Sequence, residues 1–258
     1  RNEDDESLID ALIQRAWFER QFGELQEADR HLREARRRGR TRDNPYRELL
    51  ARHHLAWVAF GQGDEEGAVE HFQAVLEQSR EHGYRQLALQ CLNGLGEVAR
   101  FRGDAPEARR YYWRYRRTNR ELNFAQAVAT ADLNLAQVEL MTGEFEAAVE
   151  CLERSVARFE EVGGKSGRRH LIRIARLALA AGTGQWSRFD ELLRLYRAGW
   201  PEEASLLKDH PWLLEMAGGY AAEADQPERA RQAWGLAREH WERLGDEAAV
   251  ERLDDRFE

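Results

Sequence analysis

The sequence predicts an all-α protein, a right-handed α-solenoid of about six antiparallel helix pairs with a short capping helix at its C-terminal end. Three observations support this prediction. Charged and apolar helix formers dominate the 258 residues, among which only 5 are prolines. A short glycine-centred pattern recurs six times at nearly constant spacing. No apolar run approaches the roughly 18–20 residues that a membrane helix needs.

The recurring pattern is an anchor residue, usually glycine, followed by a small residue and then a larger apolar one. The anchors lie 40 or 41 residues apart, at Gly23, Gly63, Gly103, Gly143, Gly184 and Asp225. Before each anchor, apolar residues are spaced as on one face of a helix. The glycine ends that helix because it adopts the left-handed cap conformation without a Cβ clash. Each unit therefore predicts two antiparallel helices.

The anchors divide the chain, taken as one solenoid over residues 1–258, into six repeats and a cap. The repeats are expected at 9–48, 49–88, 89–128, 129–169, 170–210 and 211–245, with the capping helix at 246–257. Their helix pairs are expected at 8–22 and 25–38, 45–61 and 64–82, 85–102 and 105–121, 123–142 and 145–161, 166–182 and 186–198, and 211–224 and 227–244. The fifth repeat is degenerate, with Phe189 where alanine is expected. Pro201 and Pro211 predict an irregular junction at 199–211 that changes the curvature.

The third repeat carries the clearest likeness to a known family. Its apolar and small residues follow the spacing Leu92, Leu95, Gly96, Ala99, Gly103, Ala108 and Tyr112. This spacing resembles the tetratricopeptide repeat (TPR) consensus, and the resemblance covers residues 9–245. The basic TPR unit has about 34 residues, so a 40-residue period is similar to the long-helix TPR arrays of kinesin light chains and bacterial peptide sensors. The phrase at 92–104 also resembles C-terminal TPR regions of bacterial multidomain signalling proteins, which follow a Ser/Thr kinase, a STAND-type ATPase or a transcriptional regulator.

The resemblance implies a protein- or peptide-binding module, the sensor or regulatory segment of a larger bacterial signalling protein. In TPR arrays the first helix of each pair lines a concave groove, and the repeat register identifies the side chains that face it. The expected partner-binding residues are Trp17, His53, Trp57, Asn93, Glu97, Arg100, Asn134 and Gln137. Amide side chains can pair with a peptide backbone, and tryptophans supply apolar contact area. The expected partner is a protein or peptide in this groove, or another domain of the same full-length protein.

Two arginine-rich segments leave a second function open. The arginines of 36–42, and those of 109–120 interleaved with aromatic residues, could form a nucleic-acid-binding surface. The net charge of −8 disfavours a phosphate backbone as partner, and Tyr112 and Tyr115 fall at packing positions of the repeat. A purely intramolecular scaffold for an attached enzyme is a third reading that the sequence does not separate from the first.

No pattern predicts catalysis, a metal site or a cofactor, so we expect a protein that is not an enzyme. The segment 163–166 (Gly-Gly-Lys-Ser) resembles the end of a phosphate-binding loop, but position 159 is phenylalanine and no strand precedes it. The eight histidines show no metal-ligand spacing. The first residues include neither an initiator methionine nor an apolar signal region. We therefore expect a cytoplasmic location, no membrane association, and a fragment of a longer protein.

Overall fold

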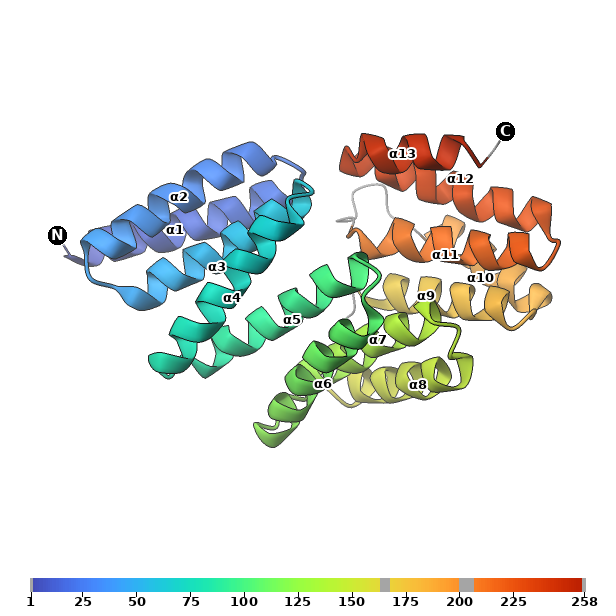
Figure 1. Cartoon of the computed structure of the whole chain (residues 1–258), viewed down its shortest axis with the longest axis horizontal. Helices are drawn as coiled ribbons and strands as arrows, with labels where there is room; N and C mark the ends of the chain where they lie inside the picture. Colours follow the sequence, from blue (N-terminus) through green and yellow to red (C-terminus); the bar gives the residue numbers. More distant parts are fainter. Residues whose placement is uncertain (1, 163–167, 200–206, 257–258) are drawn as a thin grey trace. The chain divides into compact units, whose positions relative to one another are not determined.

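The protein is helical throughout the part of the chain that the structure describes. A computed structural model describes residues 2–162, 168–199 and 207–256, and within these ranges every regular element is an α-helix (Figure 1). The predicted all-α helical repeat solenoid is therefore confirmed.

Thirteen helices lie in the described ranges. They are α1 (Asn2–Gln21), α2 (Leu25–Thr41), α3 (Pro45–Gly61), α4 (Glu65–Glu81), α5 (Arg85–Phe101), α6 (Ala105–Glu121), α7 (Ala125–Met141), α8 (Phe145–Glu161), α9 (Arg168–Gly182), α10 (Trp186–Gly199), α11 (Asp209–Glu223), α12 (Pro227–Leu244) and α13 (Glu247–Asp254). The six predicted pairs and the terminal helix are all present. The largest difference is at α1, which begins at Asn2 and not near residue 8. Ser7 is typical of a helix start, but it lies inside the helix, which the polar residues before it extend.

The helices are joined by turns that recur about every 20 residues. Each turn within the described ranges contains one residue with a positive φ, and these residues are Gly23, Asp43, Gly63, Gly83, Gly103, Asn123, Gly143, Gly184, Asp225 and Gly245. All six predicted anchors are among them. The other members are the turns between repeats, and they show that the 40-residue repeat consists of two units of similar length.

One backbone hydrogen bond closes most of these turns. The N–H of the residue after the left-handed position donates to the carbonyl oxygen five residues back, as from Asp64 to Ala59 (2.9 Å) and from Asp104 to Ala99 (2.9 Å). This 6→1 bond is the signature of the Schellman motif. The same two aspartates then cap the next helix, since the Asp64 carboxylate accepts from the N–H of Gly67 at 2.9 Å. A three-residue turn is therefore enough to reverse the chain between antiparallel helices.

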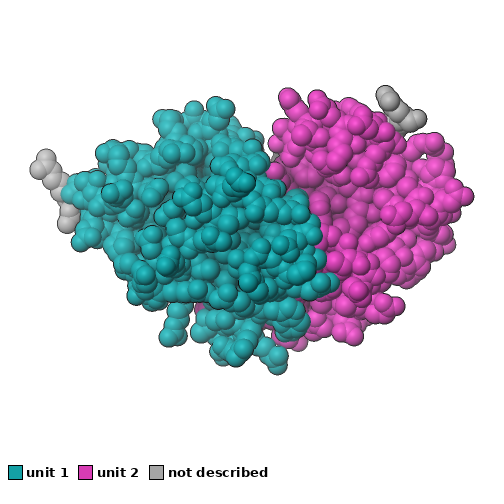
Figure 2. All heavy atoms as spheres, in the orientation of Figure 1, with its two compact units in different colours: residues 1–123 teal, residues 124–258 magenta. Residues whose placement is uncertain are grey.

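The chain forms two compact units, residues 1–123 with α1 to α6 and residues 124–258 with α7 to α13 (Figure 2). In the first unit each helix packs on the next, and α3 also contacts α1 and α5. In the second unit α7 packs on α8, and α9 contacts both α10 and α11. The expectation of one continuous solenoid over 1–258 stays a prediction.

The fifth repeat departs from the pattern of the first unit. There, the second helix of one repeat packs broadly on the first helix of the next, as α2 on α3, whereas α11 packs broadly on α9. Phe189, which replaces the expected alanine, is fully buried in α10. Most of the irregular junction expected at 199–211, and the Gly-Gly-Lys-Ser segment, lie outside the described residues.

Helical glycines let aromatic rings approach the first helices closely. A Cβ added to Gly96 of α5 would lie 2.5 Å from Cε1 of Tyr112, and one added to Gly218 of α11 would lie 2.3 Å from the Trp234 ring. The Tyr112 side chain is fully buried. The rings of the second helices therefore occupy the space that a larger residue would need, and α5 and α11 can pack tightly on their partners.

This close approach makes a prediction about stability. Gly96→Ala should destabilise the protein by about 1–3 kcal/mol, because the new methyl group overlaps a buried ring that cannot move freely. Gly219→Ala, in the helix α11, should stabilise it by about 0.5–1 kcal/mol, because no atom lies within 4 Å of the added Cβ and alanine favours the helix. Urea denaturation of both variants measures the two changes. A Gly96→Ala protein as stable as the parent would contradict the packing described.

Candidate functional site

The candidate site lies on the first helices of the N-terminal unit, α1 and α3. The repeat register puts Trp17 of α1, Trp57 of α3 and Glu97 of α5 at equivalent positions, 40 residues apart. The Trp17 side chain is 42% exposed, and Trp57 is half-buried. Two tryptophans with accessible surface therefore occupy corresponding positions on the first helices of two successive repeats.

Packing against neighbouring rings fixes the orientation of Trp57. Its indole lies edge-on to Phe72 of α4 (5.2 Å between ring centroids) and to Phe60 one turn further along α3 (6.2 Å). The indole Nε1 donates to Nε2 of His53 at 3.3 Å, which requires the proton of neutral His53 to be on Nδ1. Trp57 therefore presents its remaining surface in one defined orientation.

Arg20 places a positive charge beside this tryptophan. Its guanidinium carbon lies 5.7 Å from the centroid of the Trp57 ring, within the range of a cation–π contact. Burial lowers the pKa of Arg20, and no acidic group offsets this effect. Its Nε is buried without a hydrogen-bond partner in the described part of the chain. The site therefore contains a desolvated cation that no carboxylate neutralises among the described residues.

Two histidines of α3, His53 and His54, belong to the same cluster as Arg20 and Trp57. Burial lowers the pKa of His53 well below its ordinary value, with smaller contributions from the nearby His54 and Arg20. Burial, followed by the charge of Arg20, lowers the pKa of His54 to about 4. Both imidazoles are therefore neutral at pH 7, and Arg20 is the positive charge of the cluster.

Arg20 was not among the residues predicted to bind a partner. Its repeat equivalents are Phe60 and Arg100, and Arg100 was in the predicted set, so the repeat register could have pointed to Arg20. The residue three positions before Arg20 is Trp17, whereas the residue three positions before Arg100 is the acidic Glu97. Arg100, by contrast, is fully buried and pairs with Glu97 (2.6 Å).

The eight residues proposed to bind a partner differ in accessibility. Trp17, Trp57 and Asn93 retain exposed surface, whereas five are buried, namely His53, Glu97, Arg100, Asn134 and Gln137. The N-terminal unit contains six of the eight, and Asn134 and Gln137 belong to α7 of the C-terminal unit. The partner-binding role of all eight stays a prediction.

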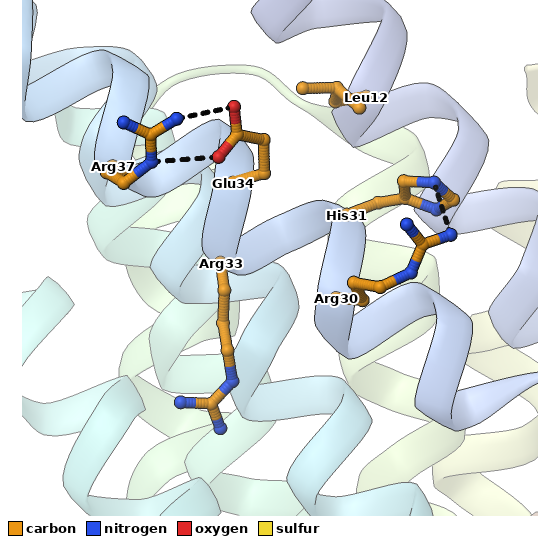
Figure 3. Close-up of a pocket in the computed structure, with 6 residues that line it drawn as sticks. All are labelled: Leu12, Arg30, His31, Arg33, Glu34 and Arg37. Carbon is orange, nitrogen blue, oxygen red and sulfur yellow. Dashed lines mark hydrogen bonds and ion pairs between the residues drawn. The ribbon is translucent and has the colours of Figure 1, made fainter.

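Many side chains of the arginine-rich segments are held by carboxylates. On α2, Arg37 binds Glu34 through two hydrogen bonds of 2.8 and 2.9 Å, at the edge of a surface pocket that also includes Leu12 and His31 (Figure 3). The remaining ion pairs in these segments include Arg36–Glu48, Arg38–Glu34, Arg42–Asp5, Arg110–Glu107 and Arg117–Glu121. These pairings reduce the charge that the two surfaces could offer to a phosphate backbone.

Among the described residues, no three histidine, cysteine, aspartate or glutamate side chains come together as a metal site would require. Cys91 and Cys151 are both buried free thiols, and burial raises the pKa of Cys91 to about 12. No described helix combines the length and apolar character needed to cross a membrane.

Comparison with family models identifies the repeats. Two tetratricopeptide repeat models match this chain, one over residues 47–120 and the other over residues 128–170. The chain therefore carries tetratricopeptide repeats, and this part of the sequence prediction is confirmed. The likeness to C-terminal regions of bacterial multidomain signalling proteins stays a prediction.

Solved structures show the same fold at low identity. A Rap protein complexed with Competence and Sporulation Factor is 13% identical with a TM-score of 0.68, covering 95% of this chain and 72% of that one. NprR in complex with its cognate peptide NprX is 10% identical with a TM-score of 0.66, covering 90% and 66%. Kinesin light chain TPR-like repeats from Podosopora anserina are 20% identical with a TM-score of 0.56, covering 74% and 93%. No curated protein matches the sequence.

The histidine cluster predicts a pH dependence of stability. An unfolded histidine titrates near its ordinary value of 6.5, whereas His54 in the folded protein titrates at about 4. Between these values the unfolded state binds a proton that the folded state does not, so stability falls as the pH falls from 6.5 towards 4. At pH 5 this effect amounts to about 1–2 kcal/mol for His54.

Replacing His54 should remove that part of the dependence. In His54→Gln, the loss of unfolding free energy between pH 7.5 and pH 5 should be smaller than in the parent by this amount, as measured by urea denaturation at both pH values. His82→Gln, which changes an exposed histidine, serves as the matched control and should keep the dependence of the parent. Equal dependence in all three proteins would show that His54 is not kept neutral by burial.

Proposed function

We propose that this chain is a protein- or peptide-binding TPR module without catalytic activity, and that the N-terminal unit contacts its partner through α1 and α3. The observation that carries the proposal is the cluster of Arg20 and Trp57, with Trp17 at the equivalent position of α1. It combines accessible aromatic surface with a partly buried cation that has no carboxylate partner in the described residues.

The cluster favours a partner that carries an anionic group. Removing a guanidinium from water is costly unless an anion pairs with it. An aspartate, a glutamate or a C-terminal carboxylate of a peptide could accept two parallel N–H bonds from Arg20. The tryptophans beside it would contact an adjacent apolar side chain, because Trp and Arg contribute most to binding when they lie together in a desolvated centre.

The half-buried amide of Asn93 extends this surface onto α5. An asparagine side chain both donates and accepts, so it suits the N–H and C=O groups of an extended peptide. The buried members of the predicted set would lie beneath this surface and hold its side chains in place. Glu97 and Arg100 of α5, which form an ion pair, are two of them. Asn134 and Gln137 are proposed to play the corresponding part on α7, within the C-terminal unit.

The similar structures support this proposal through their fold. One of them is described in complex with its cognate peptide and another with a factor that it binds. At 10% and 13% identity these likenesses cannot transfer a ligand, so the peptide class rests on the cluster. We further propose that the module is a cytoplasmic sensor or regulatory segment of a larger bacterial signalling protein.

A peptide selection tests the proposed site. A library of random seven-residue peptides, displayed on phage and selected on the full chain, should enrich sequences that combine an acidic residue with an apolar one. Calorimetry should then show that Arg20→Gln weakens the selected peptides at least tenfold, because a charge-assisted hydrogen bond contributes about 1.5–3 kcal/mol. Trp57→Ala should weaken them by a similar factor.

The control for this experiment is Arg117→Gln, which removes an arginine of α6 whose side chain is 83% exposed and paired with Glu121. It should leave the affinities unchanged. Selection of no peptide, or affinities insensitive to Arg20 and Trp57, would contradict the proposal.

The peptide-binding proposal and the nucleic-acid alternative differ in whether the chain binds a nucleic acid. Because many arginines of residues 36–42 and 109–120 are paired with carboxylates and the net charge is −8, a random 20-nucleotide single strand should not bind measurably, even in 20 mM salt. Fluorescence anisotropy of a labelled strand measures this. Binding with a steep salt dependence would favour the alternative over a peptide partner.

A further inference from the structure

A second apolar stripe runs along α1, on a face other than that of Trp17 and Arg20. Its members follow the 3-and-4 spacing of one helix face, at Leu8, Ala11, Arg15 and Phe18 of α1, and Phe22 continues the spacing in the turn that follows the helix. The side chains of Leu8, Phe18 and Phe22 are 40%, 57% and 78% exposed. Exposed aromatics in a row on one helix face are the mark of an interaction surface.

The repeat register shows what this face does in the next repeat. Forty residues further along the chain, the equivalents of Ala11, Arg15 and Phe18 are Ala51, Leu55 and Val58 of α3. All three are buried, and they form one core cluster with Ala28, Leu32 and Ala35 of α2. The second helix of the preceding repeat, α2, therefore packs on this stripe of α3.

The third repeat uses the same face in the same way. The equivalent residues of α5 are Cys91, Leu95 and Val98, and all are at most 2% exposed. They share a core cluster with Ala68 and Phe72 of α4. Two successive first helices thus use these positions to receive a second helix, and α1 presents the same positions uncovered.

We propose that the stripe of α1 is the receiving face for a further amphipathic helix of the α2 and α4 type. Such a helix carries a small residue with a large apolar residue four positions later, as Ala68 and Phe72 do in α4, and lies antiparallel to α1. The interface is continuous with the α2–α3 and α4–α5 interfaces of this unit.

Local details of α1 fit such an occupant. Phe18 and Phe22 line a shallow surface pocket with Ala11 and Arg15. Arg15 stands where the other two repeats have leucine, and its guanidinium is held by Glu19 at 2.9 Å, so its aliphatic stem is free to cover apolar surface. The Phe18 ring packs edge-on against the Trp17 ring, with the ring centroids 5.0 Å apart.

The proposal can be tested with a helix from this same chain. A fluorescein-labelled peptide of residues 64–82, which contains α4, should bind the full chain saturably in an anisotropy titration. Phe18→Glu with Phe22→Glu should weaken binding at least tenfold, because each change replaces a buried aromatic contact with a charge. Trp113→Glu, which alters an aromatic of α6 that is 49% exposed, is the matched control and should leave the affinity unchanged.

A fused repeat supplies a second measurement that does not depend on the helicity of a free peptide. In a chimera, a copy of residues 45–84 precedes residue 5 of the chain and preserves the 40-residue period. The two glutamates should lower Tm by only about 1 °C in the parent, where the phenylalanines are exposed, and by at least 5 °C in the chimera, where they would be buried.

The remaining outcomes overturn the proposal. An equal effect of the glutamates on Tm in the parent and the chimera, together with no binding of the peptide, would show that the face does not receive a helix of this type. Light scattering that reveals a dimer of the parent chain, dissociated by Phe18→Glu, would make a second copy the occupant instead. The peptide site is tested separately through Arg20 and Trp57, neither of which is changed in these variants.

Discussion

The three-residue turn with one left-handed residue is the constraint on which the rest of the structure depends. Its 6→1 hydrogen bond, as from Asp64 to Ala59, ends one helix, and the next residue starts another in the opposite direction. Because the turn has the same length each time, helices of 17 residues follow one another from α2 to α8. Because the helices have equal lengths, Trp17 and Trp57 lie at equivalent positions on the first helices of successive repeats. For the same reason, the second apolar stripe of α1 can be compared position by position with α3 and α5.

The sequence predicted the fold well because the turn chemistry is visible in it. The anchors such as Gly63 and Gly103 predicted the helix ends closely, and Asp64 and Asp104, the residues after them, cap the next helix. The 20-residue sub-period was missed because the turns between repeats place Asp43 and Asn123 in the left-handed conformation. Aspartate and asparagine tolerate that conformation, but unlike glycine they are common elsewhere in a chain and so do not mark a turn in the sequence.

The candidate site was predictable only in part. Period and register identify which helix face a residue occupies, so Trp17 and Trp57 followed from the sequence alone. They do not determine how much of a side chain its neighbours cover. Glu97 and Arg100 are buried and pair with each other, whereas Arg20, at a position equivalent to Arg100, has a histidine pair and a tryptophan as neighbours. The difference between the paired and the unpaired arginine lies three positions earlier on the same helix, where Arg100 follows Glu97 and Arg20 follows Trp17.

In the first unit, each helix packs mainly on the helices that precede and follow it in the chain. Contacts between residues close in sequence need little loop closure, so folding of such an array starts in many places and spreads to its neighbours. Loss of structure follows the same rule, because an end helix such as α13 contacts chiefly α12 and can detach without disturbing the others. The free energy of local opening therefore rises from the end helices towards α4 and α5.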